Sequence, residues 1–225
     1  YVLAQFGPIA HVITDMEMEQ AGRTAECEIV MVECVQNRIG AYNQDGYTQG
    51  ITFSAARNGL VAGIWKICEK PCLTYFREIA HGTYLKMIAE SAGYSVMLIN
   101  GDTPQEEREK SLAAVEKHGV DILLGSNAIK QGIDITHVRS EINAAGGKSS
   151  IDTVQRKGRG GRVCHDPKCV VCAKYGRKTK VTLYDFKDSD SSKTGDTEKT
   201  RHWLENHYLA RRAAYESRGY VVKMR

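Results

Sequence analysis

The sequence predicts an α/β fold in which helices flank a parallel sheet, and three observations support this class. Short stretches rich in β-branched and other apolar residues recur along the chain, and each is typical of a strand buried on both faces of a sheet. Segments with helical periodicity separate these stretches, and the turns that join the two kinds of segment are short. This alternation is the pattern of strand–helix–strand units with right-handed crossovers.

The expected elements alternate regularly up to residue 125. A short helix over 14–22 is capped by Thr14 and closed by Gly22, and a polar, glycine-rich loop over 36–50 follows the first strand. Thr103 at the N-cap, Pro104 at the first helical position and Glu106 have the spacing of a capping box. We expect strands over 27–35, 72–76, 94–99 and 120–125, and helices over 54–69, 78–93 and 103–119.

The alternation continues in the second half of the chain. We expect strands over 138–144 and 180–186, with a helix over 149–157 between them. Residues 187–200 are polar and rich in Ser and Asp, which indicates a flexible linker. The final helix, over 198–219, carries an apolar stripe that we expect to pack on the core: Trp203, Leu204, Tyr208 and Tyr215.

These elements suggest a division of the chain into three parts. Residues 1–27 form an interdomain segment, residues 28–187 the main α/β domain, and residues 188–225 a linker with a C-terminal helix. A cysteine-rich, basic insert over 163–180 interrupts the main domain. The chain starts without a methionine, as we expect of a fragment or a processed chain.

Composition excludes some classes of protein. The sequence has no apolar run long enough to span a bilayer, and its first residues lack the features of a secretory signal. The seven cysteines are an odd number, which favours reduced thiols in a cytoplasmic compartment. We expect four of them to be small core residues: Cys27, Cys34, Cys68 and Cys72.

The net charge is only +4, but the basic residues are unevenly distributed. Between residues 156 and 180, nine lysines and arginines stand against one acidic residue, Asp166. A solvated face is the simpler interpretation of a basic run, whereas a cluster this dense also favours contact with a polyanion.

The segment GGKSS, residues 146–150, resembles the end of a nucleotide-binding P-loop but is too short to be one. A P-loop requires a glycine five residues before Gly147, and Ile142 stands there, inside an expected strand. We therefore expect a strand-to-helix turn at Gly146 and Gly147, with Ser149 or Ser150 as the helix cap. The sequence thus predicts neither a Walker A phosphate cradle nor the acidic Walker B ligands of magnesium.

Four other segments carry a more specific signal. Residues 155–162, QRKGRGGR, have the pattern Q-x-x-G-R-x-G-R, and CLTYFREIAHGTYL, LINGDTPQEERE and LLGSNAIKQGIDI precede them in that order. Together they resemble motif IV, the segment between motifs IV and V, motif V and motif VI of superfamily-two helicases. FGPIAHVIT, GITFSAARN and HYLARRAAYESRGYVV look most like the UvsW-type phage helicases and their Rad25-like bacterial relatives. The resemblance implies the second, C-terminal RecA-like domain of such an enzyme.

The resemblance implies a role in ATP hydrolysis for residues of motifs V and VI. Arg159 and Arg162 would be arginine fingers on the γ-phosphate, with Gln155 organising that end of the nucleotide. Gly132, Asp134 and Arg156 would contact ATP, although Asp134 could instead stabilise a turn. ATP and Mg²⁺ would be held mostly by a first RecA-like domain, in the same polypeptide or on a partner chain.

The resemblance also implies contacts with a nucleic-acid backbone, in the first place that of DNA, with RNA left open. Such contacts read phosphates rather than bases. Gln105 and Arg108 are weaker candidates, because a solvated helix face with an internal ion pair explains them equally well. The main candidates are Arg77, Gly101, Asp102, Ser126 and Asn127.

The insert after motif VI contains a possible metal site. Cys164, Cys169 and Cys172 offer three thiolates, and His165 is the candidate fourth ligand of a zinc ion. Against this, Cys164 and His165 are adjacent in the chain. A plain loop of free cysteines and a redox pair are the alternatives. The other histidines receive no catalytic role, because the sequence pairs none of them with a nucleophile.

The functional hypothesis is therefore an ATP-dependent DNA helicase or translocase, of which this chain is the second motor domain. Alone it would neither bind ATP tightly nor hydrolyse it. Two alternatives stay open. One is a non-enzymatic nucleic-acid-binding module built on the basic insert, and the other is a translocase subunit of a restriction or remodelling system.

Overall fold

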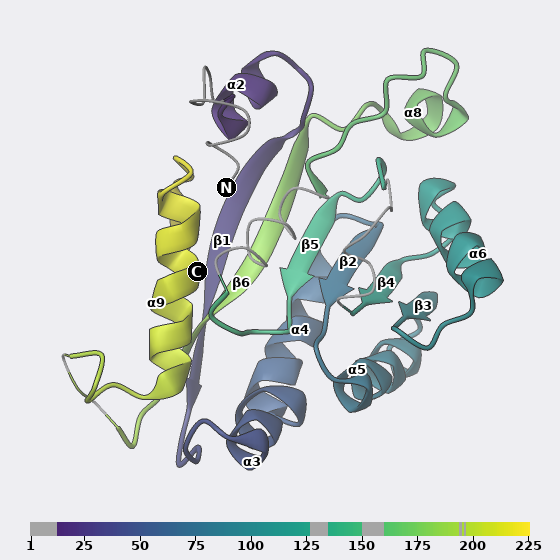
Figure 1. Cartoon of the computed structure of the whole chain (residues 1–225). Helices are drawn as coiled ribbons and strands as arrows, with labels where there is room; N and C mark the ends of the chain where they lie inside the picture. Colours follow the sequence, from purple (N-terminus) through teal and green to yellow (C-terminus); the bar gives the residue numbers. More distant parts are fainter. Residues whose placement is uncertain (1–12, 127–134, 150–159, 194, 196) are drawn as a thin grey trace, which may run out of the picture.

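The computed structural model describes residues 13–126, 135–149, 160–193, 195 and 197–225. Its seven strands form one parallel sheet in the order β3-β4-β2-β5-β6-β1-β7 (Figure 1). The strands are β1 (Glu26–Gln36), β2 (Cys72–Tyr75), β3 (Val96–Ile99), β4 (Ile122–Gly125), β5 (Ser140–Asn143), β6 (Lys180–Asp190) and β7 (Val222–Met224). This sheet, with helices along it, confirms the predicted α/β class.

The helices alternate with the strands as the sequence predicts. They are α2 (Asp15–Gln20), α3 (Gln44–Tyr47), the π-helix η1 (Thr48–Thr52), α4 (Ala55–Ile67), α5 (Ile79–Ser91), α6 (Gln105–Glu116), α8 (Val170–Tyr175) and α9 (Trp203–Glu216). Among the described residues, none of these helices has the length and apolarity needed to cross a bilayer.

Both faces of the sheet are buried, which explains why its strands are almost continuously apolar. Along β1, Val30, Val32 and Cys34 point to the face covered by α4 and α5. The alternate residues Ile29 and Met31 point to the other face, where α9 lies alongside β1 and β6 (Figure 1). Helix α6 covers that second face over the β3–β4 end of the sheet. Because successive side chains point to opposite faces, one strand contributes to two cores.

The expected apolar stripe of the last helix is buried as predicted. Leu204, Tyr208 and Tyr215 are 1–3% exposed, and Trp203 is half-buried. Three of the four predicted core cysteines are buried, whereas Cys68 is only partly so, and the described cysteines are all free thiols.

Two predictions about local structure before β4 are wrong. The polar loop expected over 36–50 contains α3 and the start of η1, because Asn43 caps α3 through its side chain and Ile51 reaches the small core of Tyr47 and Leu204. The capping box at Thr103 does not form, since Pro104 occupies the N-cap of α6. The Thr103 hydroxyl instead accepts a hydrogen bond from the backbone N–H of Asn100, in the turn before the helix.

The linker expected from residue 187 begins later, because β6 runs through Asp190. Its polar residues are strand-forming here because partners elsewhere in the chain satisfy them. Asp188 pairs with Arg57 at 2.8 Å, and the Asp190 carboxylate accepts hydrogen bonds from the backbone N–H groups of Arg38 and Ile39. The C-terminal residues also add an unpredicted strand, β7, which pairs with β1.

Candidate nucleic-acid and nucleotide interface

The carboxyl ends of three neighbouring strands bring several predicted nucleic-acid-binding residues to one edge of the sheet. Gly125 at the end of β4 pairs in register with Tyr75 at the end of β2 and with Ile99 at the end of β3. The parallel ladder therefore ends along one line. The residues that follow these strand ends, called here the strand-end surface, are Arg77, Gly101, Asp102 and Ser126.

The turn after β3 is ordered by its own side chains. Asn100 Oδ1 accepts a hydrogen bond from the backbone N–H of Asp102 at 2.9 Å, and the Asn100 N–H donates to Thr103 Oγ1 at 2.9 Å. Gly101 and Asp102 are exposed, and a Cβ at Gly101 would meet nothing within 4 Å. Helix α6 begins just beyond, without a side-chain cap. The N–H groups of its first turn are of the kind that stabilise an anion at a helix N-terminus.

Ser126 and Arg77 follow the carboxyl ends of the paired strands β4 and β2. The backbone N–H of Ser126 donates to the carbonyl of Ile99 at 2.9 Å, which continues the sheet pairing into the predicted motif V. The Arg77 guanidinium lies 5.1 Å from the centre of the Tyr47 ring, in a cation–π contact. A hydrogen bond with the Tyr42 side chain raises the pKa of Arg77. An exposed cation is thus held at the edge by two aromatic side chains.

A second feature of this edge is the turn after β5, over residues 144–147, which contains the GGKSS glycines. Gly146 and Gly147 have φ values of 62° and 88°, a conformation that residues with a Cβ rarely adopt. The predicted turn is confirmed. The Tyr47 hydroxyl donates to the carbonyl of Ala145, and Arg57 donates to that of Ala144. The part of the following helix that was expected over 150–157 lies outside the described residues.

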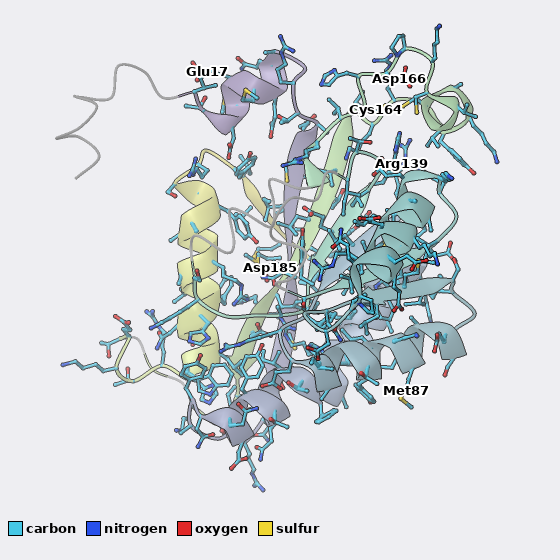
Figure 2. The ribbon with its side chains drawn as sticks, turned by 45° about the vertical axis from the view of Figure 1, so that its right-hand side comes forward. Glu17, Met87, Arg139, Cys164, Asp166 and Asp185 are labelled. Atoms are coloured by element: carbon cyan, nitrogen blue, oxygen red, sulfur yellow. The ribbon has the colours of Figure 1, made fainter. Side chains whose placement is uncertain are left out.

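Four buried charges fix this turn from beneath, and the sequence analysis did not identify them. We call Arg57, Arg211, Asp185 and Asp188 the buried arginine network; each is at most 1% exposed. Arg211 Nε lies 3.0 Å from Asp185 Oδ2, and its Nη2 lies 3.2 Å from Asp188 Oδ2. Arg211 Nη1 also donates to the Gly147 carbonyl at 2.7 Å. Figure 2 shows Asp185 in the interior of the molecule.

The sequence signal for this network is a charged residue flanked by apolar residues inside a strand. Asp185 follows Leu183 and Tyr184 and precedes Phe186, so a carboxylate stands at a position whose neighbours are core residues. A buried carboxylate requires a partner. The sequence cannot say which cation supplies it, because Arg211 lies 26 residues further along the chain, on another element.

The end of motif VI packs tightly against β5. The N–H of Gly160 donates to Glu141 Oε1 at 3.1 Å, and its carbonyl accepts from Lys178 Nζ at 2.6 Å. A Cβ at Gly160 would lie 2.5 Å from the Glu141 carboxyl carbon, so any larger residue at this position would have to displace the Glu141 side chain. Two residues later, Arg162 is exposed, and its backbone forms an isolated antiparallel bridge with Thr24.

Several predicted site residues fall outside the part of the chain that the structure describes. For motif V these are Asn127, Gly132 and Asp134, and for motif VI they are Gln155, Arg156 and Arg159. The two weaker candidates are described: Gln105 donates to Glu109 at 2.6 Å along α6, and Arg108 is half-buried on the same helix.

The cysteines of the insert come together with a histidine from a different segment. Nε2 of His137 lies 3.5 Å from Sγ of Cys169 and 3.6 Å from Sγ of Cys172. One ligand atom from each of His137, Cys164, Cys169 and Cys172 lies within 4.8 Å of the others. The predicted fourth ligand, His165, is exposed and is not in the cluster. Figure 2 shows Cys164 and Asp166 at the same end of the molecule as Arg139.

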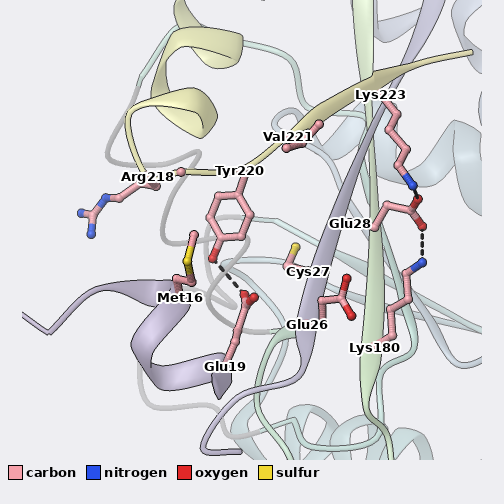
Figure 3. A pocket seen from close by; sticks show the side chains of 11 residues that line it. Met16, Glu19, Glu26, Cys27, Glu28, Lys180, Arg218, Tyr220, Val221 and Lys223 are labelled. Carbon is pink, nitrogen blue, oxygen red and sulfur yellow. Dashed lines mark hydrogen bonds and ion pairs between the residues drawn. The ribbon is translucent and has the colours of Figure 1, made fainter. Parts of the chain in front are cut away.

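A pocket of 190 Å³ lies away from the strand-end surface, where α2 meets β1, β6 and β7 (Figure 3). The Tyr220 hydroxyl donates to Glu19 at 3.1 Å, and Glu28 pairs with both Lys180 and Lys223. Hydrogen bonds from these two lysines lower the pKa of Glu28. None of the predicted site residues lines the pocket, and its contacts link α2 to Tyr220 and β7 to β1.

Comparison with known families identifies the motif-bearing segment. Residues 63–164 match the family described as helicase conserved C-terminal domain. The chain is 29% identical over 104 residues to putative helicase 22 of Sulfolobus islandicus filamentous virus, an overlap of 46% of this chain and 19% of that protein. It is 33% identical over 98 residues to the pre-mRNA-splicing ATP-dependent RNA helicase PRP28 of Phaeosphaeria nodorum, an overlap of 44% and 13%. The chain thus spans less than a fifth of either relative.

Solved structures resemble the chain over most of its length. T4 UvsW matches with a TM-score of 0.64 and 22% identity, covering 90% of this chain and 42% of that one. The C-terminal domain of the DEAD-box protein Dbp5 matches with a TM-score of 0.58 and 16% identity, covering 88% and 89%. At these identities the likeness establishes the fold.

Proposed function

We propose, from the premise that this chain carries the C-terminal RecA-like domain of a superfamily-two helicase, that it is the second motor domain of an ATP-dependent helicase or translocase. The observation that carries the proposal is the register of β2, β3 and β4, which aligns the strand-end surface beside a buried network that holds the turn before motif VI. We propose residues 28–187, with the insert at 163–180, as the motor domain, flanked by residues 1–27 and 188–225.

The strand-end surface is suited to hold a nucleic-acid backbone. The exposed Arg77 offers a guanidinium, and Gly101 allows a phosphate to approach the chain closely because no side chain covers it. Ser126 and Asn127 would add hydrogen bonds from motif V, and Asp102 would contribute through its backbone. These groups address phosphate and sugar rather than base edges, so binding should tolerate any sequence.

ATP and Mg²⁺ would lie between this domain and a first RecA-like domain. Arg159 and Arg162 would meet the negative charge that spreads over the transferring phosphoryl group, and Gln155 and Arg156 would orient its end of the nucleotide. Gly132 and Asp134 would contact the ribose side. The buried arginine network supports this role, because it fixes the turn from which the motif VI segment departs.

Arg162→Ala and Arg159→Ala in the full-length protein test the motor function. We expect each to lower the ATPase rate by a factor of roughly 10³ or more, the usual contribution of an arginine finger, with nucleic-acid binding unchanged. Arg218→Ala, an exposed arginine beside the pocket of Figure 3, is the matched control. Loss of binding with a normal ATPase rate would instead favour the non-enzymatic binding module.

The nucleic acid is proposed to be DNA, as in the phage helicases that the flanking segments resemble. RNA is the second candidate, because the relatives include a protein whose name describes an RNA helicase. Single strands of DNA and RNA with the same sequence, compared for stimulation of the ATPase rate, separate the two. A strand-displacement assay on the better substrate then separates unwinding from translocation, including translocation by a subunit of a restriction or remodelling system.

A further inference from the structure

The insert after motif VI contains the one group of metal-ligating side chains found among the described residues. It combines three thiols of the insert with an imidazole from the segment before β5. We propose that His137, Cys164, Cys169 and Cys172 bind a zinc ion that holds the insert onto the sheet. This site goes beyond the proposed motor function and stands independently of it.

The two nitrogen–sulfur distances match those of a tetrahedral zinc site. Zn–S bonds of ~2.3 Å and Zn–N bonds of ~2.0–2.1 Å at tetrahedral angles place a nitrogen and a sulfur ligand ~3.6 Å apart. His137 Nε2 lies 3.5 Å from Cys169 Sγ and 3.6 Å from Cys172 Sγ. Hydrogen bonding alone is a poor explanation for three thiols around one imidazole nitrogen, because a thiol is a weak donor and acceptor. A soft dication matches this ligand set.

The imidazole is oriented for metal binding by a carboxylate. His137 Nδ1 lies 2.7 Å from Glu116 Oε2, so Nδ1–H donates to the carboxylate and the Nε2 lone pair faces the thiols. Glu116 is itself fixed by the backbone N–H of Thr136 at 2.7 Å and by the Thr136 hydroxyl at 2.6 Å. Such an arrangement of carboxylate, histidine and metal is typical of zinc sites.

Backbone hydrogen bonds of the insert also hold the cysteines near His137. Cys169 is the N-cap of α8, and its Sγ accepts a hydrogen bond from the Cys172 N–H at 3.5 Å. Helix α8 ends at Tyr175 and is followed by the C-cap Gly176, whose φ is 77°. Arg139, two residues after His137, donates to the carbonyls of Tyr175 and Gly176 at 3.0 and 2.8 Å. The segment of His137 and the insert of the cysteines are thus also joined by contacts outside the cluster.

The insert needs such a link because it has almost no core. Helix α8 is six residues long, none of them is buried, and Val170 is 79% exposed. A segment this short and polar cannot hold its position by burying apolar surface, whereas a structural zinc contributes folding free energy directly. Four protein ligands complete the tetrahedron, so we infer a structural rather than a catalytic ion.

The site has a structural connection to motif VI. Lys178, which closes the insert before β6, donates to the carbonyls of Val138 and Gly160 at 2.8 and 2.6 Å. Val138 follows His137 directly, and Gly160 belongs to motif VI. A zinc ion at the cluster would therefore help to fix the position of Lys178, and with it the end of motif VI at Gly160.

Metal analysis of the purified 225-residue chain tests the proposal. We expect a single zinc ion per chain by mass spectrometry, lost in Cys172→Ser and in His137→Ala. Cys68→Ser and His165→Ala are the matched controls, since Cys68 lies outside the cluster and His165 is the neighbouring histidine that the structure leaves out of it. Zinc retained by His137→Ala but lost by His165→Ala would overturn the assignment.

Cobalt titration of the metal-free wild-type chain gives a second test that no folding defect of a variant can obscure. We expect the intense visible bands of tetrahedral Co²⁺, with thiolate charge-transfer absorption, displaced by added zinc. Glu116→Gln should keep the stoichiometry and weaken zinc affinity by roughly 10–100-fold. A Cys169–Cys172 disulfide in the freshly purified chain, or no saturable cobalt binding, would refute the site. Neither readout requires ATPase activity, so this proposal can fail while the motor function stands.

Discussion

Arg57 and Arg211 are both fully buried and share the carboxylate of Asp188, while Asp185 pairs with Arg211 and accepts hydrogen bonds from Tyr215 and Asn143. Burying four charges costs free energy, which is offset only when each is paired and hydrogen-bonded. Arg57 lies 4.2 Å above the Phe186 ring as well, so its planar group is fixed on several sides. The network therefore fixes one geometry of the turn after β5.

Arg211→Ala should lower the free energy of unfolding by about 3–5 kcal/mol, because it leaves two buried carboxylates without their shared cation. Arg212→Ala is the matched control one position along α9: its ion pair with Glu216 at 2.8 Å is about half exposed, and such pairs contribute little. Urea denaturation of both variants gives the comparison. Equal midpoints for the two would contradict a structural role for the network.

Two buried histidines should make stability depend on pH. Burial, and next the charge of Arg57, lowers the pKa of His81 to about 3, and burial with the charge of Arg211 lowers that of His207 to about 4. The unfolded chain therefore binds protons that the folded chain does not. The stabilisation is complete above pH 6.5 and is lost as the pH falls toward the folded values, by at most about 1.4 kcal/mol per pH unit for each histidine.

His81→Gln isolates one of these contributions, since a glutamine can still donate to the Asn58 side chain, which lies 3.0 Å from His81 Nε2. Unfolding free energies of the variant and the wild type, measured between pH 7 and pH 4, should converge as the pH falls. His165→Gln, at an exposed position, serves as the control. A difference between variant and wild type that stays constant with pH would show that His81 is not the titrating group.

At the scale of elements, the sequence predicts the core strands and helices well because their burial is periodic. Both faces of β1 are apolar, and α4 follows Ser54, where the helix was expected to start; the Ser54 side chain caps it. The sequence fails where tertiary partners override composition. Asp188 and Asp190 extend β6 because buried arginine and backbone N–H groups satisfy them, and Val222–Met224 becomes a strand because β1 offers a free edge. Such partners are far away in the chain.

The packing of α5 depends on a glycine that a propensity scale would replace. A Cβ at Gly82 would lie 2.6 Å from the Phe76 ring, whereas nothing lies within 4 Å of one at Gly59 in α4. Gly82→Ala should therefore destabilise the chain by roughly 1–3 kcal/mol, the range for overpacking. Gly59→Ala should stabilise it by about 0.5–1 kcal/mol through helix propensity. Thermal unfolding of the pair should give opposite signs, and two stabilised variants would contradict the packing of α5.

For the whole molecule, the order of strands determines how much of the site could be predicted. Motif order along the sequence is enough to place Arg77, Gly101 and Ser126 after strands, but only the parallel register shows that β2, β3 and β4 end along one line. The histidine of the cysteine cluster illustrates the limit. His165 adjoins Cys164 in sequence, whereas His137 reaches the thiols only because the insert folds back over the start of β5.

The position of the strand-end surface predicts how binding responds to salt. If Arg77 contacts a phosphate, Arg77→Ala should weaken binding of single-stranded nucleic acid uniformly across sequences, because one backbone contact is lost. It should also make the plot of log affinity against log salt shallower by about 0.7, the counterion contribution of one phosphate on a single strand. Fluorescence anisotropy at several salt concentrations measures both, with Arg218→Ala as a control at an exposed arginine beside the pocket of Figure 3. An unchanged slope for Arg77→Ala, or an equal change for both variants, would place the nucleic acid elsewhere and leave the aligned strand ends with a structural role.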